Sequence, residues 1–89
     1  MKYKIVLKKS ARKNLQKLPL NIQQRFHALA VALQKGGPTA AHGWSNYSKL
    51  KENEYHCHLT YHYVACWRHE KETITIEVTY VGSREKAPY

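Results

Sequence analysis

The chain has 89 residues, which is the length of one small domain and leaves no room for a second. With 43% hydrophobic and 24% charged residues and no low-complexity run, its composition is typical of a globular protein, so disorder is not expected. The longest apolar run, residues 28–33, is too short for a transmembrane helix, which needs about 20 residues. The first residues lack the apolar segment of a signal peptide. We therefore expect a single cytoplasmic domain, residues 1–89, whose two cysteines are free thiols.

Positive charge is concentrated in the first half of the chain. Lys and Arg number 15 against 6 acidic residues, which gives a net charge of +9. Residues 1–51 contain eleven of the basic residues and no acid, whereas all six glutamates lie in residues 52–89. A surface of this charge attracts polyanions. The charge therefore favours RNA, DNA or an acidic protein as a partner.

The first half of the chain predicts one strand and two helices. Residues 2–8 are rich in residues that favour strands. Ser10 is a candidate N-cap, and apolar residues then recur at helical spacing as far as Leu18. Pro19 ends this helix and can begin a second one, which stops at the glycines before Pro38. The apolar face of the second helix is formed by Ile22, Phe26, Leu29 and Leu33.

The second half of the chain predicts a loop followed by three strands. Residues 38–48 have the composition of a loop. Segments rich in Tyr, Val, Thr and Ile predict strands at 54–59, 62–68 and 73–80. The order β-α-α-β-β-β predicts an α+β domain in which an antiparallel sheet packs against an N-terminal helical hairpin. In the last strand, the residues expected to face the core are Ile74, Ile76 and Val78.

The densest group of ionisable side chains lies in the first of these three strands. His56 and His58 are two residues apart, so a strand places them on one face, opposite Tyr55 and Cys57. We expect the two histidines to face out of the core, beside a basic surface. Histidine titrates near neutral pH and is a natural general acid or base. Exposed histidines without a function are the competing interpretation.

Zinc binding is another interpretation of the same cluster. Histidine and cysteine are the usual zinc ligands. However, Cys57 is expected to point away from the two histidines, and the sequence has no CxxC pair. A Ser-His-Asp or Cys-His nucleophile is also disfavoured, because the chain has no Asp and Cys57 is expected in the core. We therefore expect no metal and no cofactor.

The C-terminal segment supplies two more candidate residues. Arg84 follows the last strand, where a guanidinium can bind a phosphate through two hydrogen bonds. Tyr89 carries a hydroxyl that can donate a proton to a sugar oxygen or accept one from it. An exposed tail without a function is the competing interpretation.

The order and spacing of these segments resemble the RelE/YafQ branch of the RelE/ParE superfamily, the toxins of bacterial toxin–antitoxin pairs. The resemblance covers nearly the whole chain. It rests on the opening strand at 3–5, the helix with its Leu-Pro break at 10–19, the second helix at 22–33, Lys-Leu-Lys at 49–51, the strand at 54–59 and Val-Gly-Ser-Arg at 81–84. The family implies a ribosome-dependent endoribonuclease that cuts mRNA in the decoding site and is neutralised by a co-expressed antitoxin.

The resemblance also implies roles for individual residues. His58 and His62 would form the acid–base pair, with the acid and the base not distinguished. Arg84 would bind the phosphate, and Tyr89 would orient or deprotonate the ribose 2′-OH or stack on a base. The implied partners are a cognate antitoxin, the ribosome and mRNA, with no membrane and no small-molecule cofactor. Further residues expected to bind RNA are His56, Lys49, Lys51, Lys86, Lys13 and Lys17.

Three other functions stay open at this point. A ParE-like gyrase poison shares the fold, but it needs no acid–base cluster, so the histidine-rich strand disfavours it. The other two are a non-catalytic RNA-binding module and an inactive toxin that only binds its antitoxin.

Overall fold

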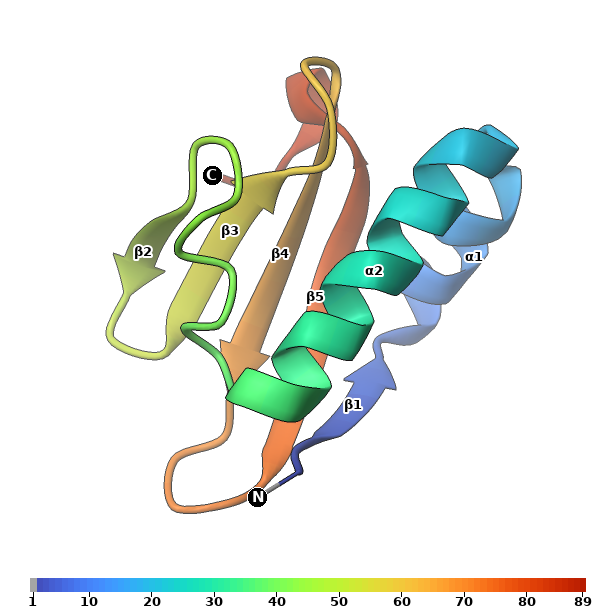
Figure 1. The fold of residues 1–89 in the computed structure, drawn as a ribbon. Helices are drawn as coiled ribbons and strands as arrows, with labels where there is room; N and C mark the ends of the chain where they lie inside the picture. The colour runs from blue at the N-terminus through green and yellow to red at the C-terminus, as the bar shows by residue number, and fades with distance from the viewer. Residues whose placement is uncertain (1) are drawn as a thin grey trace.

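The structure is a computed structural model that describes residues 2–89, with two helices and one five-stranded sheet (Figure 1). The strand order in the sheet is β1-β5-β4-β3-β2. The predicted α+β class is therefore confirmed. The elements, in chain order, are β1 (Lys4–Leu7), α1 (Lys9–Lys17), α2 (Leu20–Gly36), β2 (Ser48–Lys51), β3 (Glu54–His58), β4 (Tyr63–His69), β5 (Thr75–Ser83) and the 3-10 turn η1 (Arg84–Lys86).

The sheet differs from the prediction in two respects. β1 pairs with β5 in parallel, so the sheet is mixed rather than antiparallel. The connection between these two parallel strands is long, because it contains both helices and the other three strands. β2 is an additional edge strand, antiparallel to β3, in a segment to which the sequence assigned no strand. It is short and mostly polar, so it has too few alternating residues to reveal a strand.

The helix boundaries follow from local sequence. α1 begins at Lys9 with Lys8 as its N-cap, so the predicted cap at Ser10 is wrong by two positions. Leu18 is extended, with ψ 156°, because the following proline disfavours the helical conformation. α2 ends before Gly37, whose φ of 88° is unfavourable for other residues. The Tyr3 ring also lies 2.9 Å from the position of a Cβ at Gly37, so the site has no space for a side chain.

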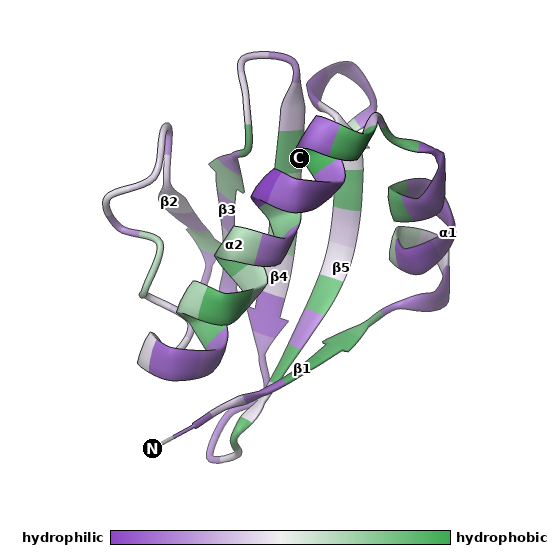
Figure 2. Ribbon diagram, turned by 45° about the vertical axis from the view of Figure 1, so that its right-hand side comes forward, coloured by the Kyte–Doolittle hydropathy of each residue, from purple (hydrophilic) through white to green (hydrophobic). Residues whose placement is uncertain are grey.

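Both helices cover the same face of the sheet, and the core lies between them and the strands (Figure 1). The four residues predicted to form the apolar face of α2 are all buried. The hydrophilic residues of α1 lie mostly on the side away from β5 (Figure 2). Ile74 is 49% exposed and not in the core as predicted, because it lies in the turn before β5 begins. Neither helix of residues 2–89 combines the length and apolarity needed to cross a membrane.

A β-bulge in β5 determines which of its side chains face the helices. Cys66 of β4 is opposite Tyr80, and the next residue, Trp67, is opposite Val78. Thr79 of β5 therefore has no partner residue in β4. Val78 and Val81 consequently both pack in the core. Tyr80 faces the other side of the sheet, which carries no helix. We call this side the open face.

Candidate functional site

His56 and His58 both lie on the open face, as their spacing predicted. Tyr55 and Cys57, the residues on the other face of β3, belong to the core. The chain crosses the open face after η1 and brings its C-terminus next to β2 and β3 (Figure 1), where Tyr89 contacts His56. The prediction that the histidines are surface groups is wrong, because each is only 8% exposed.

His56 is held between β2 and the C-terminal residue. Ser48 lies opposite His56 in the β2–β3 pairing, and its Oγ is 2.9 Å from His56 Nδ1. On another side, the centroid of the Tyr89 ring is 4.4 Å from that of His56, with 48° between the ring planes. The ring therefore has a hydrogen-bond partner at Nδ1 and an aromatic cover.

His58 is held by the loop before β2. Its backbone N–H donates to Ser45 O at 2.8 Å, and its Nδ1 lies 3.4 Å from Asn46 Nδ2. The His58 and His56 rings are 6.0 Å apart between centroids. The two imidazoles thus form one pair, each with its Nδ1 directed to a residue of the segment 46–48.

Both histidines are neutral at neutral pH. Burial lowers the pKa of His56 from 6.5, and the neighbouring His58 lowers it further, while a hydrogen bond to the Ser48 backbone partly opposes this change. Burial also lowers the pKa of His58 from 6.5, and the positive charge of Arg84 adds to this effect. Two neutral imidazoles beside a cation have the protonation state that a general base requires.

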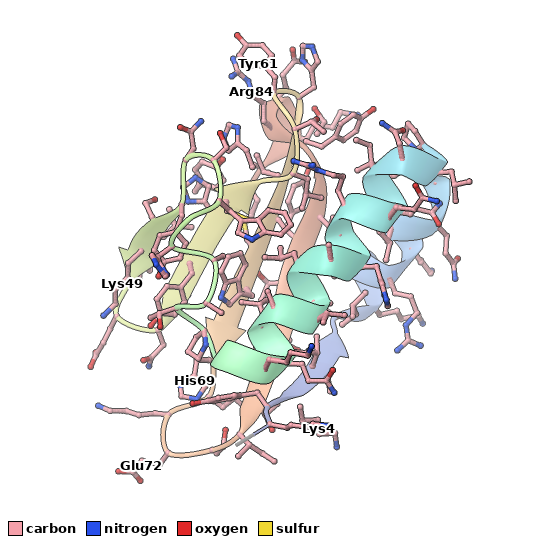
Figure 3. The ribbon with its side chains drawn as sticks, viewed as in Figure 1. Lys4, Lys49, Tyr61, His69, Glu72 and Arg84 are labelled. Atoms are coloured by element: carbon pink, nitrogen blue, oxygen red, sulfur yellow. The ribbon has the colours of Figure 1, made fainter. Side chains whose placement is uncertain are left out.

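Arg84 and Tyr61 stand together at one end of the sheet (Figure 3). Arg84 Cζ lies 4.6 Å from the centroid of the Tyr61 ring, which is a cation–π contact. The Arg84 side chain is exposed and has no carboxylate partner within residues 2–89. Its guanidinium is therefore available to bind a phosphate.

His62 lies in the loop between β3 and β4, next to this end of the sheet. Its carbonyl accepts the Arg84 backbone N–H at 2.9 Å, and its ring contacts Tyr61 at 4.9 Å between centroids. His58 instead has its ring contact with His56. The structure therefore pairs His58 with His56, while His62 is an exposed side chain beside Arg84.

Tyr89 is the covering residue of the site and is 55% exposed. Partial burial raises the pKa of its hydroxyl, and Cys66 and Tyr80 add to this, whereas Arg84 opposes it. The phenol is therefore protonated at neutral pH and can donate a hydrogen bond.

A groove of about 660 Å³ on the open face continues from Tyr89 toward β1. Glu54, Arg68 and Glu77 are register neighbours across β3, β4 and β5 and form part of its lining. Arg68 makes ion pairs of 3.5 Å with Glu77 and 3.8 Å with Glu70. The rest of the lining is formed by Lys8, Ser10, Leu50, Lys51, Cys66, Thr79, Tyr80, Pro88 and Tyr89.

The structure divides the predicted RNA-binding lysines into separate groups. Lys51 lines the groove, and Lys49 is exposed on the edge strand β2 (Figure 3). Lys17 and Lys86 are brought together around a smaller hollow of about 180 Å³ between α1 and η1. Lys13 is exposed on α1. All five are accessible to a polyanion.

Sequence reasoning did not identify Asn46, Ser48 or Tyr61. Asn46 and Ser48 contact the histidines only because β2 pairs with β3, and no pattern predicted β2. Tyr61 lies in a loop that lacked turn signals. Within residues 2–89, no group of three or more His, Cys, Asp or Glu side chains is placed to hold a metal ion.

No family model matches the sequence, and no curated protein matches it. Solved structures do match. A chain of the archaeal RelE–RelB complex from Pyrococcus horikoshii has a TM-score of 0.76 at 20% identity, over 98% of this chain and 100% of that chain. A free mutant of E. coli toxin RelE gives 0.78 at 19% identity, over 98% and 88%. The fold is that of the RelE toxins.

A third structure extends the likeness to another group of toxins. A chain of the YoeB–YefM complex from Staphylococcus aureus has a TM-score of 0.70 at 13% identity, over 94% of this chain and 99% of that chain. The RelE-type fold expected from the sequence is therefore confirmed over nearly the whole chain. His56 and His58 lie on the open face of this fold.

Proposed function

We propose that this protein is the toxin of a type II toxin–antitoxin pair and cleaves translated mRNA on the ribosome. The observation that carries the proposal is the pair of neutral histidines beside Arg84 and Tyr89 on the open face of a RelE-type fold. A gyrase poison or a passive RNA-binding module requires no such group of proton-transfer and cationic side chains.

The proposed reaction is attack of an RNA 2′-OH on the adjacent phosphate, which yields a 2′,3′-cyclic phosphate and a 5′-OH. It needs a group that accepts the 2′-OH proton, a group that protonates the leaving 5′-oxygen and a cation for the developing charge. The histidines supply the first two, with His58 and His62 as the pair implied by the resemblance. Arg84 supplies the third. Each proton-transfer group typically contributes a factor of about 10²–10⁴.

The groove gives the RNA a path across the open face. Tyr89 borders both His56 and the groove, so its ring can stack on a base next to the cleaved phosphate. Lys51 lies at the groove, and Lys49 at the neighbouring edge, where phosphates of mRNA or ribosomal RNA would be neutralised. Lys13, Lys17 and Lys86 provide a second basic surface around α1 and η1 for ribosomal RNA.

A small acidic antitoxin is the proposed protein partner. Structures similar to this chain are of a RelE–RelB complex and a YoeB–YefM complex. The net charge of +9 favours an acidic partner for the same physical reason that it favours RNA.

Expression of the protein without its partner tests this proposal. We expect translation to stop and cellular mRNAs to be cut within their coding regions, and an antitoxin encoded by the adjacent gene to prevent both effects. A matched culture expressing Arg84→Ala should grow. Inhibition of DNA supercoiling by the purified protein, with intact mRNA, would instead identify a gyrase poison.

A further inference from the structure

A second hollow, of about 340 Å³, lies between α2 and the loop that leads to β2 (Figure 1). Its volume falls within the range of sites that bind small organic groups, about 300–1,000 Å³. Its lining consists of Arg25 and Ala28 from α2 and of Gly43, Trp44 and Ser45 from the loop. The hollow is therefore large enough to take one nucleotide.

Arg25 is an exposed cation whose side chain is held in place. Its Nε donates to the carbonyl of Leu59 at 3.0 Å, and its Cζ lies 5.8 Å from the centroid of the Trp44 ring, which is a cation–π contact. Within residues 2–89, Arg25 makes no ion pair with a carboxylate. The N–H groups of its two terminal nitrogens are therefore available, in the forked arrangement that binds a phosphate.

Trp44 provides an aromatic surface on a loop whose backbone is held by hydrogen bonds. Its N–H donates to Ala41 O at 2.8 Å, and its carbonyl accepts from the Tyr47 N–H at 3.2 Å. The Trp44 side chain is partly buried against the core and also lines the hollow. Aromatic side chains can stack on any nucleobase, because every base has a π-face. The hollow thus combines a surface for a base with a cation for a phosphate.

The charge around the hollow favours a polyanion. No acidic residue precedes Glu52 in the chain, so neither α2 nor the loop supplies a carboxylate. An acidic peptide would use the guanidinium of Arg25 but not the indole of Trp44. A nucleotide uses both, because its phosphate and its base are different groups on one molecule. The pair of side chains therefore favours RNA over an acidic peptide.

The hollow adjoins the end of β3 that carries His58. The His58 backbone N–H donates to Ser45 O at 2.8 Å, and Arg25 binds the carbonyl of the next residue, Leu59. The His58 ring lies on the open face, whereas the hollow lies beside α2. An RNA strand that crosses the open face at His58 can therefore reach the hollow by passing around this end of β3.

We propose that the hollow binds one nucleotide of single-stranded RNA, with its phosphate on Arg25 and its base against Trp44. The nucleotide belongs to the RNA strand that crosses the open face, and this assignment of the strand rests on the proposed function. Binding of RNA at the hollow does not depend on cleavage.

Fluorescence titration of the full-length protein with a short single-stranded 2′-O-methyl RNA tests the site without ribosomes, because this RNA has no 2′-OH that can attack. A base stacked on Trp44 should quench its emission. Trp44→Leu retains an apolar contact with the core and leaves Trp67, which is 1% exposed and donates to Pro38 O, so RNA should not quench this variant. Trp44→Leu should also weaken binding about 5-fold or more.

Arg25→Ala tests the phosphate contact. Loss of one contact to a single strand should reduce the slope of log binding constant against log salt concentration by about 0.7. Lys35→Ala removes the same charge at an exposed position in the last turn of α2 and should leave this slope unchanged. The proposal is overturned if RNA leaves the wild-type emission unchanged, if the two variants have the same slope, or if polyglutamate quenches Trp44 as RNA does.

Crosslinking on programmed ribosomes tests the assignment of the strand. With 4-thiouridine in the mRNA beside the codon in the decoding site, we expect a crosslink to residues 43–45. Crosslinks of this segment to ribosomal RNA alone would overturn the assignment to the substrate strand. If the protein binds RNA at the hollow but cuts no mRNA, the proposed function is wrong and the nucleotide site stands.

Discussion

His58 and Arg84 belong to one site but differ in how tightly the protein holds them. His58 is buried under the loop before β2 and has a hydrogen-bond partner, whereas Arg84 is exposed and contacts the face of an aromatic ring. Loss of a buried, hydrogen-bonded side chain costs more stability than loss of an exposed one. Substitutions at the two positions should therefore separate stability from activity.

We predict that Arg84→Ala changes the free energy of unfolding by less than about 0.5 kcal/mol, while His58→Ala lowers it by about 1 kcal/mol or more. Both should abolish cleavage. Denaturant unfolding and cleavage, measured on the same samples, check this, with His27→Ala on the exposed side of α2 as the control. If Arg84→Ala cleaves RNA at the wild-type rate, the proposal that Arg84 binds the phosphate is wrong.

At the scale of single residues, the sequence predicted which side chains share a face but not how they are covered. The spacing of His56 and His58 was enough to place them opposite Tyr55 and Cys57. His56 is covered by Tyr89, which is distant along the chain and approaches only after the chain turns at η1, and His58 is covered by the loop before β2. The residues next to His56 in the sequence contain no pattern that predicts a contact with such a distant residue.

The elements with regular apolar periodicity were predicted well, and the irregular ones were not. The apolar face of α2 follows a helical repeat, and all four of its residues are buried. In β5, the bulge at Thr79 breaks the alternation, so a strict two-residue pattern assigns Tyr80 and Val81 to the wrong faces. β2 and the parallel pairing of β1 with β5 depend on distant partners, which local sequence does not reveal.

The two faces of α2 provide a matched pair of leucines. Leu29 is fully buried between α2 and the sheet, whereas Leu20, in the first turn of the same helix, is 69% exposed. We predict that Leu29→Ala lowers the free energy of unfolding by about 2–5 kcal/mol because it leaves a cavity. Leu20→Ala should change it by less than about 0.5 kcal/mol. Equal effects in chemical denaturation would contradict the placement of α2.

For the molecule as a whole, the buried histidines link stability to pH. In the folded protein the pKa values of His56 and His58 lie below 6.5, because burial disfavours the charged ring, and the unfolded chain has the ordinary value. The unfolded state therefore binds more protons as the pH falls below 6.5. Acid consequently favours unfolding, and the stability that these rings provide is present above this pH.

We predict that the unfolding free energy decreases as the pH falls from 6.5 through the folded-state pKa values of the two histidines. The double variant His56→Gln/His58→Gln should show a weaker dependence over this range. His27→Gln, which changes an exposed histidine, should retain the wild-type dependence. Thermal melting of the three proteins across this range checks the prediction, and identical profiles would contradict burial of the pair.

The most direct test of the whole account is single-turnover cleavage of mRNA on programmed ribosomes, with analysis of the RNA ends. The account predicts cleavage within the decoding site, with a 2′,3′-cyclic phosphate on one product and a 5′-OH on the other. Arg84→Ala should eliminate these products, and His27→Ala should not. Intact mRNA with the folded wild-type protein, or products with a 5′-phosphate, would contradict the proposed site and its chemistry.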